Sequence, residues 1–393
     1  MWRFLVLALV IIVVVVFGFS LIDGGSGGDV SATTVLSVGE SDISGFERAI
    51  DPRVWDFPRD HGSHPEFQTE WWYYTGNLST AEGRRFGFQF TIFRRAITPQ
   101  VTDSASEWRS NQVYMAHFTL SDIETGRFYD SERYSRGGAD LAGALPDPTQ
   151  PDALYHVWLE NWDISGLNAD TTEMQIQADA GDFAIDFMLE QAKPVALQGI
   201  DGLSAKSDEP GNASYYYSLP RLLTSGSITL GEDSFNVNGT TWMDREFSTS
   251  ALGSDAQGWD WFALHLDDGR DLVVGQIRLK AGGARTAYTG MIVFEDGSTH
   301  HLAFDEYSIE STGEWTSPHT GAVYPAGWTI TLAAAAVEQD DDLVLTLTPL
   351  MPDQELHNGA IAYWEGAVQI SGGAEGYGYA ELTGYTDAIS GRF

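Results

Sequence analysis

Short runs in which apolar and polar residues alternate recur along most of the chain, and no other feature constrains the fold as much. Examples are RRFGFQFTIFRRA at 84–96, QVYMAHFTLSDI at 112–123 and FAIDFMLE at 183–190. Such alternation places the apolar side chains on one face of an extended strand. Only a short piece near 97–108 departs from this pattern toward a helical period. The pattern therefore predicts an all-β protein of antiparallel strands joined by turns.

A second set of strand-like runs follows the first along the chain. It includes GSITLGEDSFNVNGTTWMD at 226–244 and GWDWFALHLDDGRDLVVGQIRL at 258–279, with a turn signal, DDG, at 267–269. A chain of 393 residues is also too long for one ordinary core. We therefore expect two successive antiparallel sheets, closed as barrels or packed as sandwiches, in domains at 46–240 and 241–393.

The N-terminus indicates where the protein resides. Residues 4–22 are almost wholly apolar, which is just enough to span about 30 Å of hydrocarbon. Arg3 precedes this run, so the positive-inside rule places the body of the protein outside the cytoplasm. We interpret 1–22 as a signal anchor in the cytoplasmic membrane, with a cleaved signal peptide as the alternative; either exports a periplasmic or extracytoplasmic body. The Gly- and Ser-rich residues 23–45 are typical of a flexible tether.

Charge and composition exclude several classes of function. The formal net charge of −35 repels phosphate backbones, which argues against nucleic acid as a partner. The chain has no cysteine, so disulfides, thiol nucleophiles and cysteine-ligated zinc are excluded. It also has no P-loop and no G-x-G-x-x-G motif after a strand, the phosphate-binding signatures of NTPases and dinucleotide enzymes.

The stretch DHGSHPEFQTEWWYYTGNL at 60–78 raises the question of a metal site. His61 and His64 are three residues apart among acidic residues, so metal ligation is conceivable. Pro65, however, interrupts any helix that would place both imidazoles on one face, and the H-E-x-x-H spacing is absent. We therefore predict no metal, and we expect these histidines to hydrogen-bond a loop that leads into the first strand.

In that strand the side chains alternate between two faces. One face carries Glu70, Trp72 and Tyr74, and the other carries Trp71 and Tyr73. A glutamate on the face of two aromatic rings is either a buried acid with a raised pKa or the partner of an arginine.

The segment 240–266 places carboxyl groups among indoles: Trp242, Asp244, Glu246, Trp259 and Trp261. The first three share one face of an extended strand. A carboxylic acid between apolar aromatic walls stays protonated more readily, which suits a general acid, and aromatic faces stabilise a nearby cation. The alternative is an ion pair of Asp244 with Arg245 or Arg278 that fixes a loop.

The stretch SYYYSLPRL at 214–222 is the third candidate. Tyr215 and Tyr217 lie on the same side of an extended strand and would line a pocket wall; the alternative is ordinary strand packing.

Three motifs in the right order carry a family resemblance: FPRDHGSHPEFQTEWWYYTGNL, TTWMDREFS…GWDWFALHLDDG and YWEGAV…GYGYAELTGY. Together they resemble the carotenoid 1,2-hydratase/AttH-type family of lipocalin-like proteins, over roughly residues 50–390. The resemblance implies an all-β fold of two consecutive lipocalin-like (calycin) antiparallel β-barrels.

The resemblance also implies a chemistry. The hydratases of this family protonate an isolated double bond of an acyclic carotenoid with an aspartate, shelter the cation with aromatic rings and capture it with water. More distant relatives catalyse pericyclic reactions, and the exported AttH-like branch tends to accompany ABC-transporter permeases. The catalytic aspartate matches Asp244, preceded by Trp242 where the hydratases have a tyrosine. Their His-x-Trp pair matches Tyr215 and Tyr217, so this sequence departs at both positions.

We therefore predict an exported, membrane-tethered protein that binds an apolar lipid or isoprenoid without a cofactor. Asp244 and Trp242 are the predicted catalytic residues of a hydro-lyase or hydrolase. The predicted ligand-binding residues are Glu70, Trp72, Tyr74, Tyr215, Tyr217, Glu246, Trp259 and Trp261. The alternative is a non-catalytic lipid-binding or accessory protein that works with an ABC-type permease.

Overall fold

A computed structural model of the chain describes residues 43–100, 104–249, 252–253, 255–285, 290–359 and 361–386. The expected membrane anchor at 4–22 and nearly all of the expected tether at 23–45 lie outside the described residues. Within the described ranges, no helix has the length and apolar character needed to cross a membrane.

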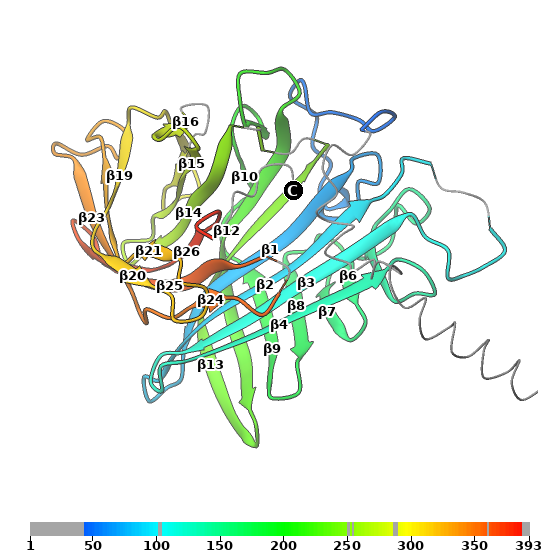
Figure 1. Ribbon diagram of the computed structural model, residues 1–393, viewed down its shortest axis with the longest axis horizontal. Helices are drawn as coiled ribbons and strands as arrows, with labels where there is room; N and C mark the ends of the chain where they lie inside the picture. The colour runs from blue at the N-terminus through cyan, green and yellow to red at the C-terminus, as the bar shows by residue number, and fades with distance from the viewer. Residues whose placement is uncertain are drawn as a thin grey trace, which may run out of the picture. The chain divides into compact units, whose positions relative to one another are not determined.

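The first half of the described chain forms one antiparallel sheet. Its strands are β1 (Thr69–Ser79), β2 (Arg85–Ala96), β3 (Gln112–Asp122), β4 (Arg127–Arg136), β5 (Ala142–Leu145), β6 (His156–Leu159), β7 (Trp162–Gly166), β8 (Glu173–Asp179), β9 (Phe183–Gln191), β10 (Ala196–Leu197), β11 (Leu203–Ala205), β12 (Ala213–Leu230) and β13 (Asp233–Ser248). They pair in the order β4-β3-β2-β1-β13-β12-β9-β8-β7-β6-β5, with β10 and β11 added to β12 (Figure 1). A single-turn 3₁₀ helix, η1 (Arg59–His61), precedes β1.

The second half forms another antiparallel sheet. Its strands are β14 (Ala256–Leu266), β15 (Asp271–Leu279), β16 (Ala284–Arg285), β17 (Gly290–Val293), β18 (Thr299–Leu302), β19 (Tyr307–Ser311), β22 (Trp328–Leu332), β23 (Leu343–Pro349), β24 (Glu355–Leu356), β25 (Tyr363–Gly372) and β26 (Gly376–Leu382). Their order is β18-β17-β15-β14-β26-β25-β23-β22-β19, with β16 on β15 and β24 on β25; β20 (Glu314–Thr316) and β21 (Val323–Pro325) pair separately. Two nearly closed, barrel-like sheets confirm the predicted pair of lipocalin-like barrels.

The two sheets divide at a different point from the expected one. The expected boundary between 240 and 241 falls inside β13, which pairs with β1 and β12 and belongs wholly to the first sheet. The change of sheet lies instead between Ser248 and Ala256. Gly239 allows β13 to lie close to β1 at this point, because an added Cβ would lie only 2.1 Å from the carbonyl oxygen of Asn77 on β1.

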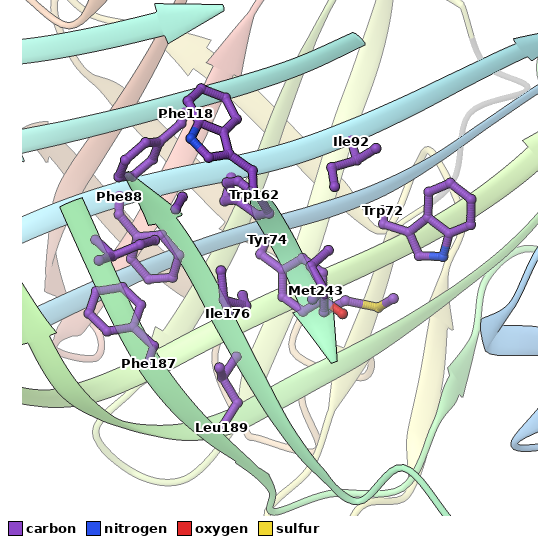
Figure 2. Packing of buried hydrophobic residues seen from close by; sticks show 14 of the residues in the cluster. Trp72, Tyr74, Phe88, Ile92, Phe118, Trp162, Ile176, Phe187, Leu189 and Met243 are labelled. Carbon is purple, nitrogen blue, oxygen red and sulfur yellow. The ribbon is translucent and has the colours of Figure 1, made fainter. Parts of the chain in front are cut away.

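Each sheet encloses its own hydrophobic core. The first core contains Trp72, Tyr74 and Met243 from the central strands, packed against aromatic rings such as Phe118 and Trp162 (Figure 2). The second core lies inside the other sheet, around residues such as Phe262, Trp328 and Trp364.

A third buried cluster joins the two sheets. It combines Tyr73 and Trp242 of the first sheet with Trp261 and Val273 of the second. Asn77 Nδ2 also donates to the carbonyl oxygen of Gly378 at 2.8 Å. Strand β1 is therefore buried on both of its faces, one inside the first barrel and one against the second.

Candidate active site

A cavity of about 130 Å³ lies between the two barrels. The first sheet contributes side chains from β1, β2, β3, β12 and β13, and the second contributes side chains from β14, β15, β25 and β26. Seven of the residues that line it carry large aromatic rings: Trp71, Tyr73, Phe93, Tyr216, Trp259, Trp261 and Tyr363. Four carboxyl groups also face it: Asp244, Glu246, Glu365 and Glu381.

Asp244 is held in this wall by three uncharged donors. Ser218 Oγ and the indole Nε1 of Trp242 donate to its Oδ1 at 2.5 Å and 2.7 Å, and the Tyr216 hydroxyl donates to Oδ2 at 2.8 Å. The carboxyl is only 4% exposed. Burial raises the pKa of Asp244 to about 7, although these three hydrogen bonds act to lower it. Asp244 is therefore a carboxyl that titrates near neutral pH.

The strand geometry explains this placement. Asp244 lies opposite Tyr73 on β1 and opposite Ser218 on β12. Trp242, Asp244 and Glu246 alternate along β13, so they share one face, as the sequence indicated, and the structure turns this face toward the second barrel. The alternative of an Asp244–arginine pair is not found among the described residues, because Arg245 lies on the opposite face and Arg278 pairs with Asp260 at 3.0 Å.

A second pair of acids forms the facing wall. Glu365 on β25 and Glu381 on β26 are direct cross-strand partners. The Tyr73 hydroxyl donates to Glu365 Oε2 at 3.0 Å. Burial, and then the neighbouring charge of Glu381, raise the pKa of Glu365 well above its ordinary range; burial raises the pKa of Glu381 to about 8. The sequence motifs contained both residues, but no local pattern set them apart from other strand glutamates.

Cationic and neutral groups complete the lining. Lys206 Nζ lies 2.8 Å from Glu246 Oε1. The Trp261 ring meets the Tyr73 ring edge to face, with centroids 5.3 Å apart. His117 Nδ1 and the Tyr363 hydroxyl are 2.6 Å apart. The cavity thus combines a wall rich in aromatic rings with carboxyl groups that either have a raised pKa or are paired with a lysine.

The predicted ligand-binding residues divide between this cavity and the first barrel. Glu246, Trp259 and Trp261 line the cavity, and Trp242 lies behind Asp244. The other five predicted residues do not line it: Glu70, Trp72, Tyr74, Tyr215 and Tyr217. Trp72, Tyr74 and Tyr217 are in the first core, and the Tyr215 hydroxyl donates to the carbonyl oxygen of Asp51.

The predicted alternation is present, but Trp72, Tyr74 and Tyr217 lie on the face that is turned into the first barrel. The residues in between, Trp71, Tyr73 and Tyr216, line the cavity. Both faces of β1 and β12 carry aromatic residues, and both are buried, so hydrophobicity does not tell the barrel interior from the cavity wall.

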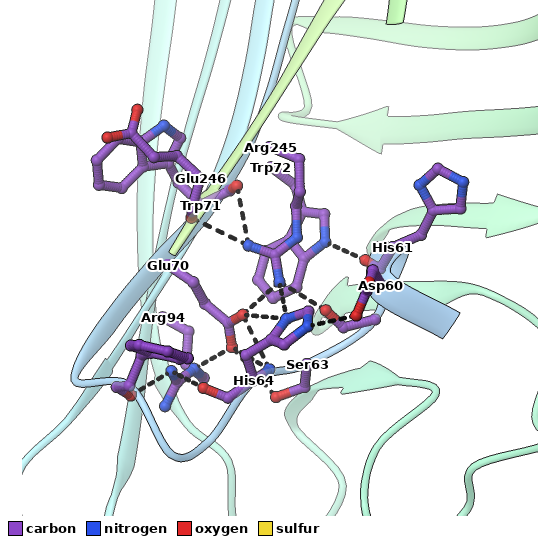
Figure 3. Close-up of polar contacts among 12 residues, drawn as sticks. Asp60, His61, Ser63, His64, Glu70, Trp71, Trp72, Arg94, Arg245 and Glu246 are labelled. Atoms are coloured by element: carbon purple, nitrogen blue, oxygen red, sulfur yellow. Dashed lines mark hydrogen bonds and ion pairs between the residues drawn. The ribbon is translucent and has the colours of Figure 1, made fainter. Parts of the chain in front are cut away.

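Glu70 instead forms the centre of a buried polar network at one end of the first barrel (Figure 3). Its carboxylate contacts the guanidinium groups of Arg94 and Arg245 and accepts from Ser63 Oγ at 3.1 Å. Burial alone would raise the pKa of Glu70, but the two arginines hold it well below its ordinary range. Glu70 is therefore a permanent anion and not a proton donor.

The two histidines of the opening stretch belong to the same region. His64 Nε2 is 3.0 Å from Asp60 Oδ1, and His61 Nδ1 is 2.6 Å from the Tyr217 hydroxyl. Burial, and then the charge of Arg245, lower the pKa of His61 to about 3. These contacts fix the loop before β1 in place.

Two consecutive lipocalin-like barrels, with buried acids in the cavity between them, define a class of double-barrel proteins. The chain belongs to the AttH-like family, whose sequence model matches residues 48–385. A crystal structure of a protein from Nitrosomonas europaea assigned to AttH has 34% sequence identity and a TM-score of 0.74, and the match covers 87% of this chain and 100% of that one.

More distant structures share the fold. Kievitone hydratase from Nectria haematococca matches with 14% identity and a TM-score of 0.63, over 87% of this chain and 98% of that one. CghA matches with 12% identity and a TM-score of 0.52, over 87% of this chain and 96% of that one. No curated protein sequence matches the chain.

Proposed function

We propose that the protein binds one end of an apolar isoprenoid or lipid in the cavity between its barrels and hydrates a carbon–carbon double bond there, with Asp244 as the general acid. One observation carries the proposal. Asp244 is a buried carboxyl without a cationic partner among the described residues, it faces a mainly aromatic cavity, and its pKa is raised to about 7. A general acid functions best when its pKa lies near the working pH.

The reaction follows from the positions of the donors. Oδ1 of Asp244 already accepts two hydrogen bonds and Oδ2 accepts one, so Oδ2 has room for the proton. That proton forms a new C–H bond with one alkene carbon and leaves a cation on the other. The oxygen of a water molecule bonds to the cation, and the proton released by this water returns to the Asp244 carboxylate. The rings of Trp259, Trp261 and Tyr73 stabilise the positive charge in between.

The comparisons support the same chemical class. The family membership gives the scaffold, and one solved relative on this scaffold is named as a hydratase. The apolar run at 4–22 supports an exported protein tethered to the membrane, where an isoprenoid or lipid substrate would be at hand.

The test uses the full chain in detergent, incubated with geranylgeraniol, squalene or lycopene in water labelled with heavy oxygen. We expect mass spectrometry to detect a hydrated product that carries the label. Asp244→Asn should keep substrate binding and lower the rate by at least about a hundredfold, because one general acid typically contributes that much. Asp186→Asn, at an exposed position of β9, is the matched control and should keep the rate.

The outcomes separate the two interpretations of the cavity. Binding without labelled product would favour a lipid-binding or permease-accessory protein. Turnover that persists in the folded Asp244→Asn variant would overturn the assignment of the acid.

A further inference from the structure

The buried carboxyl groups of this chain fall into two kinds. Several are paired with cations: Glu70 contacts two arginines, and Asp271 lies 2.8 Å from Lys193 Nζ and 2.7 Å from Arg221 Nη2. Glu365 is fully buried and Glu381 is partly buried, yet neither forms an ion pair with a lysine, arginine or histidine among the described residues. A buried carboxylate without a counter-charge is costly, so such groups stay protonated or receive a cation from elsewhere.

The surroundings of this pair suit a positive charge. Trp261 on β14 is the direct cross-strand neighbour of Glu381, which is in turn the neighbour of Glu365. The Tyr73 ring lies edge to face with Trp261 and donates its hydroxyl to Glu365. Aromatic rings in a desolvated pocket attract organic cations, and quaternary ammonium groups are bound in aromatic cages of this kind.

We propose that Glu365, Glu381 and the rings of Tyr73, Trp259 and Trp261 form a binding site for a small organic cation, of which a quaternary ammonium group is the simplest. The cavity of about 130 Å³ is of the size that admits a small ring or an alkylammonium head. This inference uses the cavity of the proposed function but not its reaction. A permanently charged ligand would occupy the same part of the cavity in which the proposed hydration forms a short-lived carbocation.

Proton release is a consequence of such binding. Burial raises the pKa of Glu381 to about 8 and that of Glu365 well above its ordinary range, which favours the protonated form of both carboxyls. A cation beside them favours the ionised form, so an O–H bond breaks and the proton passes to the buffer. The charged or titratable groups around the pair are Tyr73 on β1, His117 on β3, Tyr363 on β25, Tyr379 on β26, Asp244 and Glu246 on β13, and Lys206 paired with Glu246.

The test compares two molecules that differ in charge but hardly in shape. Choline and 3,3-dimethylbutan-1-ol share the same skeleton, with a charged nitrogen in one and a neutral carbon in the other. We expect the full chain to bind choline at least about tenfold more tightly by titration calorimetry. The choline enthalpy should also change with the ionisation enthalpy of the buffer, which reports the proton released. Equal affinities for the two molecules, or no detectable choline binding, would overturn the proposal without any variant.

Variants then locate the site. Glu365→Gln and Glu381→Gln replace protonated carboxyls by neutral amides of the same shape, so both should fold. We expect either change to reduce the preference for choline to within about twofold. Glu355→Gln is the matched control: Glu355 is a buried glutamate of the same barrel, it accepts from Thr320 Oγ1 at 2.6 Å and Tyr324 at 2.9 Å, and it does not line the cavity.

The results remain distinct from those of the hydration test. A preference for choline that survives in both folded cavity variants would overturn the cation site, whatever the outcome with isoprenoids. Choline binding that follows the expected pattern would support it even if no alkene is hydrated.

Discussion

Glu70 and Asp244 are buried to a similar depth on opposite sides of one strand pair, yet they have opposite electrostatic characters. Glu70 contacts the guanidinium groups of Arg94 and Arg245, and its pKa lies well below the ordinary range. Among the described residues, Asp244 accepts hydrogen bonds only from a hydroxyl, a phenol and an indole, and burial raises its pKa to about 7. Depth alone therefore does not determine whether a carboxyl is charged; the counter-charge does.

The two sites also respond to pH with opposite sign. The folded-state pKa of Glu70 is lower than its ordinary value of 4.5, so its contribution to stability is present above that pH and is lost as pH falls through the folded pKa. The folded-state pKa of Asp244 is higher than its ordinary value of 3.8. Its contribution is therefore present below about pH 4 and is lost as pH rises to about 7.

Among the changes proposed here, removing the charge of Glu70 should lower the stability of the folded protein the most. Glu70→Gln leaves two buried guanidinium groups without their anion. We expect the free energy of unfolding at pH 7 to fall by about 5 kcal/mol, at the upper end of the cost of breaking a buried ion pair. Urea denaturation measures this change, with the exposed Glu190→Gln of β9 as the control. A loss no larger than that of the control would mean that the network is not needed for stability.

The corresponding change at Asp244 should behave differently. Asp244→Asn removes the titrating group but keeps its shape, so the variant loses the pH dependence that Asp244 causes. A shift of about three pKa units corresponds to about 4 kcal/mol. Relative to the unmodified protein, the variant should therefore gain up to that much stability as pH rises from about 4 to 8. Urea denaturation across this range tests the sign, and parallel curves for the two proteins would contradict the raised pKa.

Removing one hydrogen-bond donor from Asp244 should have a smaller effect, on the pKa of this carboxyl. Tyr216→Phe removes one of the donors that lower the pKa of Asp244, so this pKa should rise by up to about one unit. The midpoint of the pH–rate profile for hydration should rise with it, because the protonated form is the active one. Tyr215→Phe is the matched control, since that hydroxyl donates to the carbonyl oxygen of Asp51 outside the cavity. Equal midpoints in the two variants would exclude Tyr216 as a determinant of this pKa.

Much of the fold could be predicted from the local alternation in the sequence, whereas the residues of the cavity could be predicted only in part. Period-two alternation predicted the strands, and it placed Trp242, Asp244 and Glu246 on one face of β13. It did not distinguish Trp72 from Tyr73 as the pocket residue, because each face of β1 is buried against a different neighbour.

The local sequence pattern gave no indication of the cavity wall that lies opposite Asp244. Glu365 and Glu381 reach the same cavity as Asp244 only when the second barrel packs on the first, and they lie about 120 to 140 residues further along the chain. A single sequence does not specify which strand of one barrel will face which strand of the other. The two arginines on Glu70 likewise come from β2 and β13, strands far apart in the sequence.

Strand β13 divides its residues between two tasks. Met243, Arg245 and Phe247 point into the first barrel or its polar network, whereas Trp242, Asp244 and Glu246 face the second barrel. The odd positions preserve the first barrel, while the even positions form both the cavity wall and part of the packing between the barrels. Positions 244 and 246 are therefore better suited to randomisation in a protein library than 242, because Trp242 is fully buried between the two barrels and its loss would leave a cavity there.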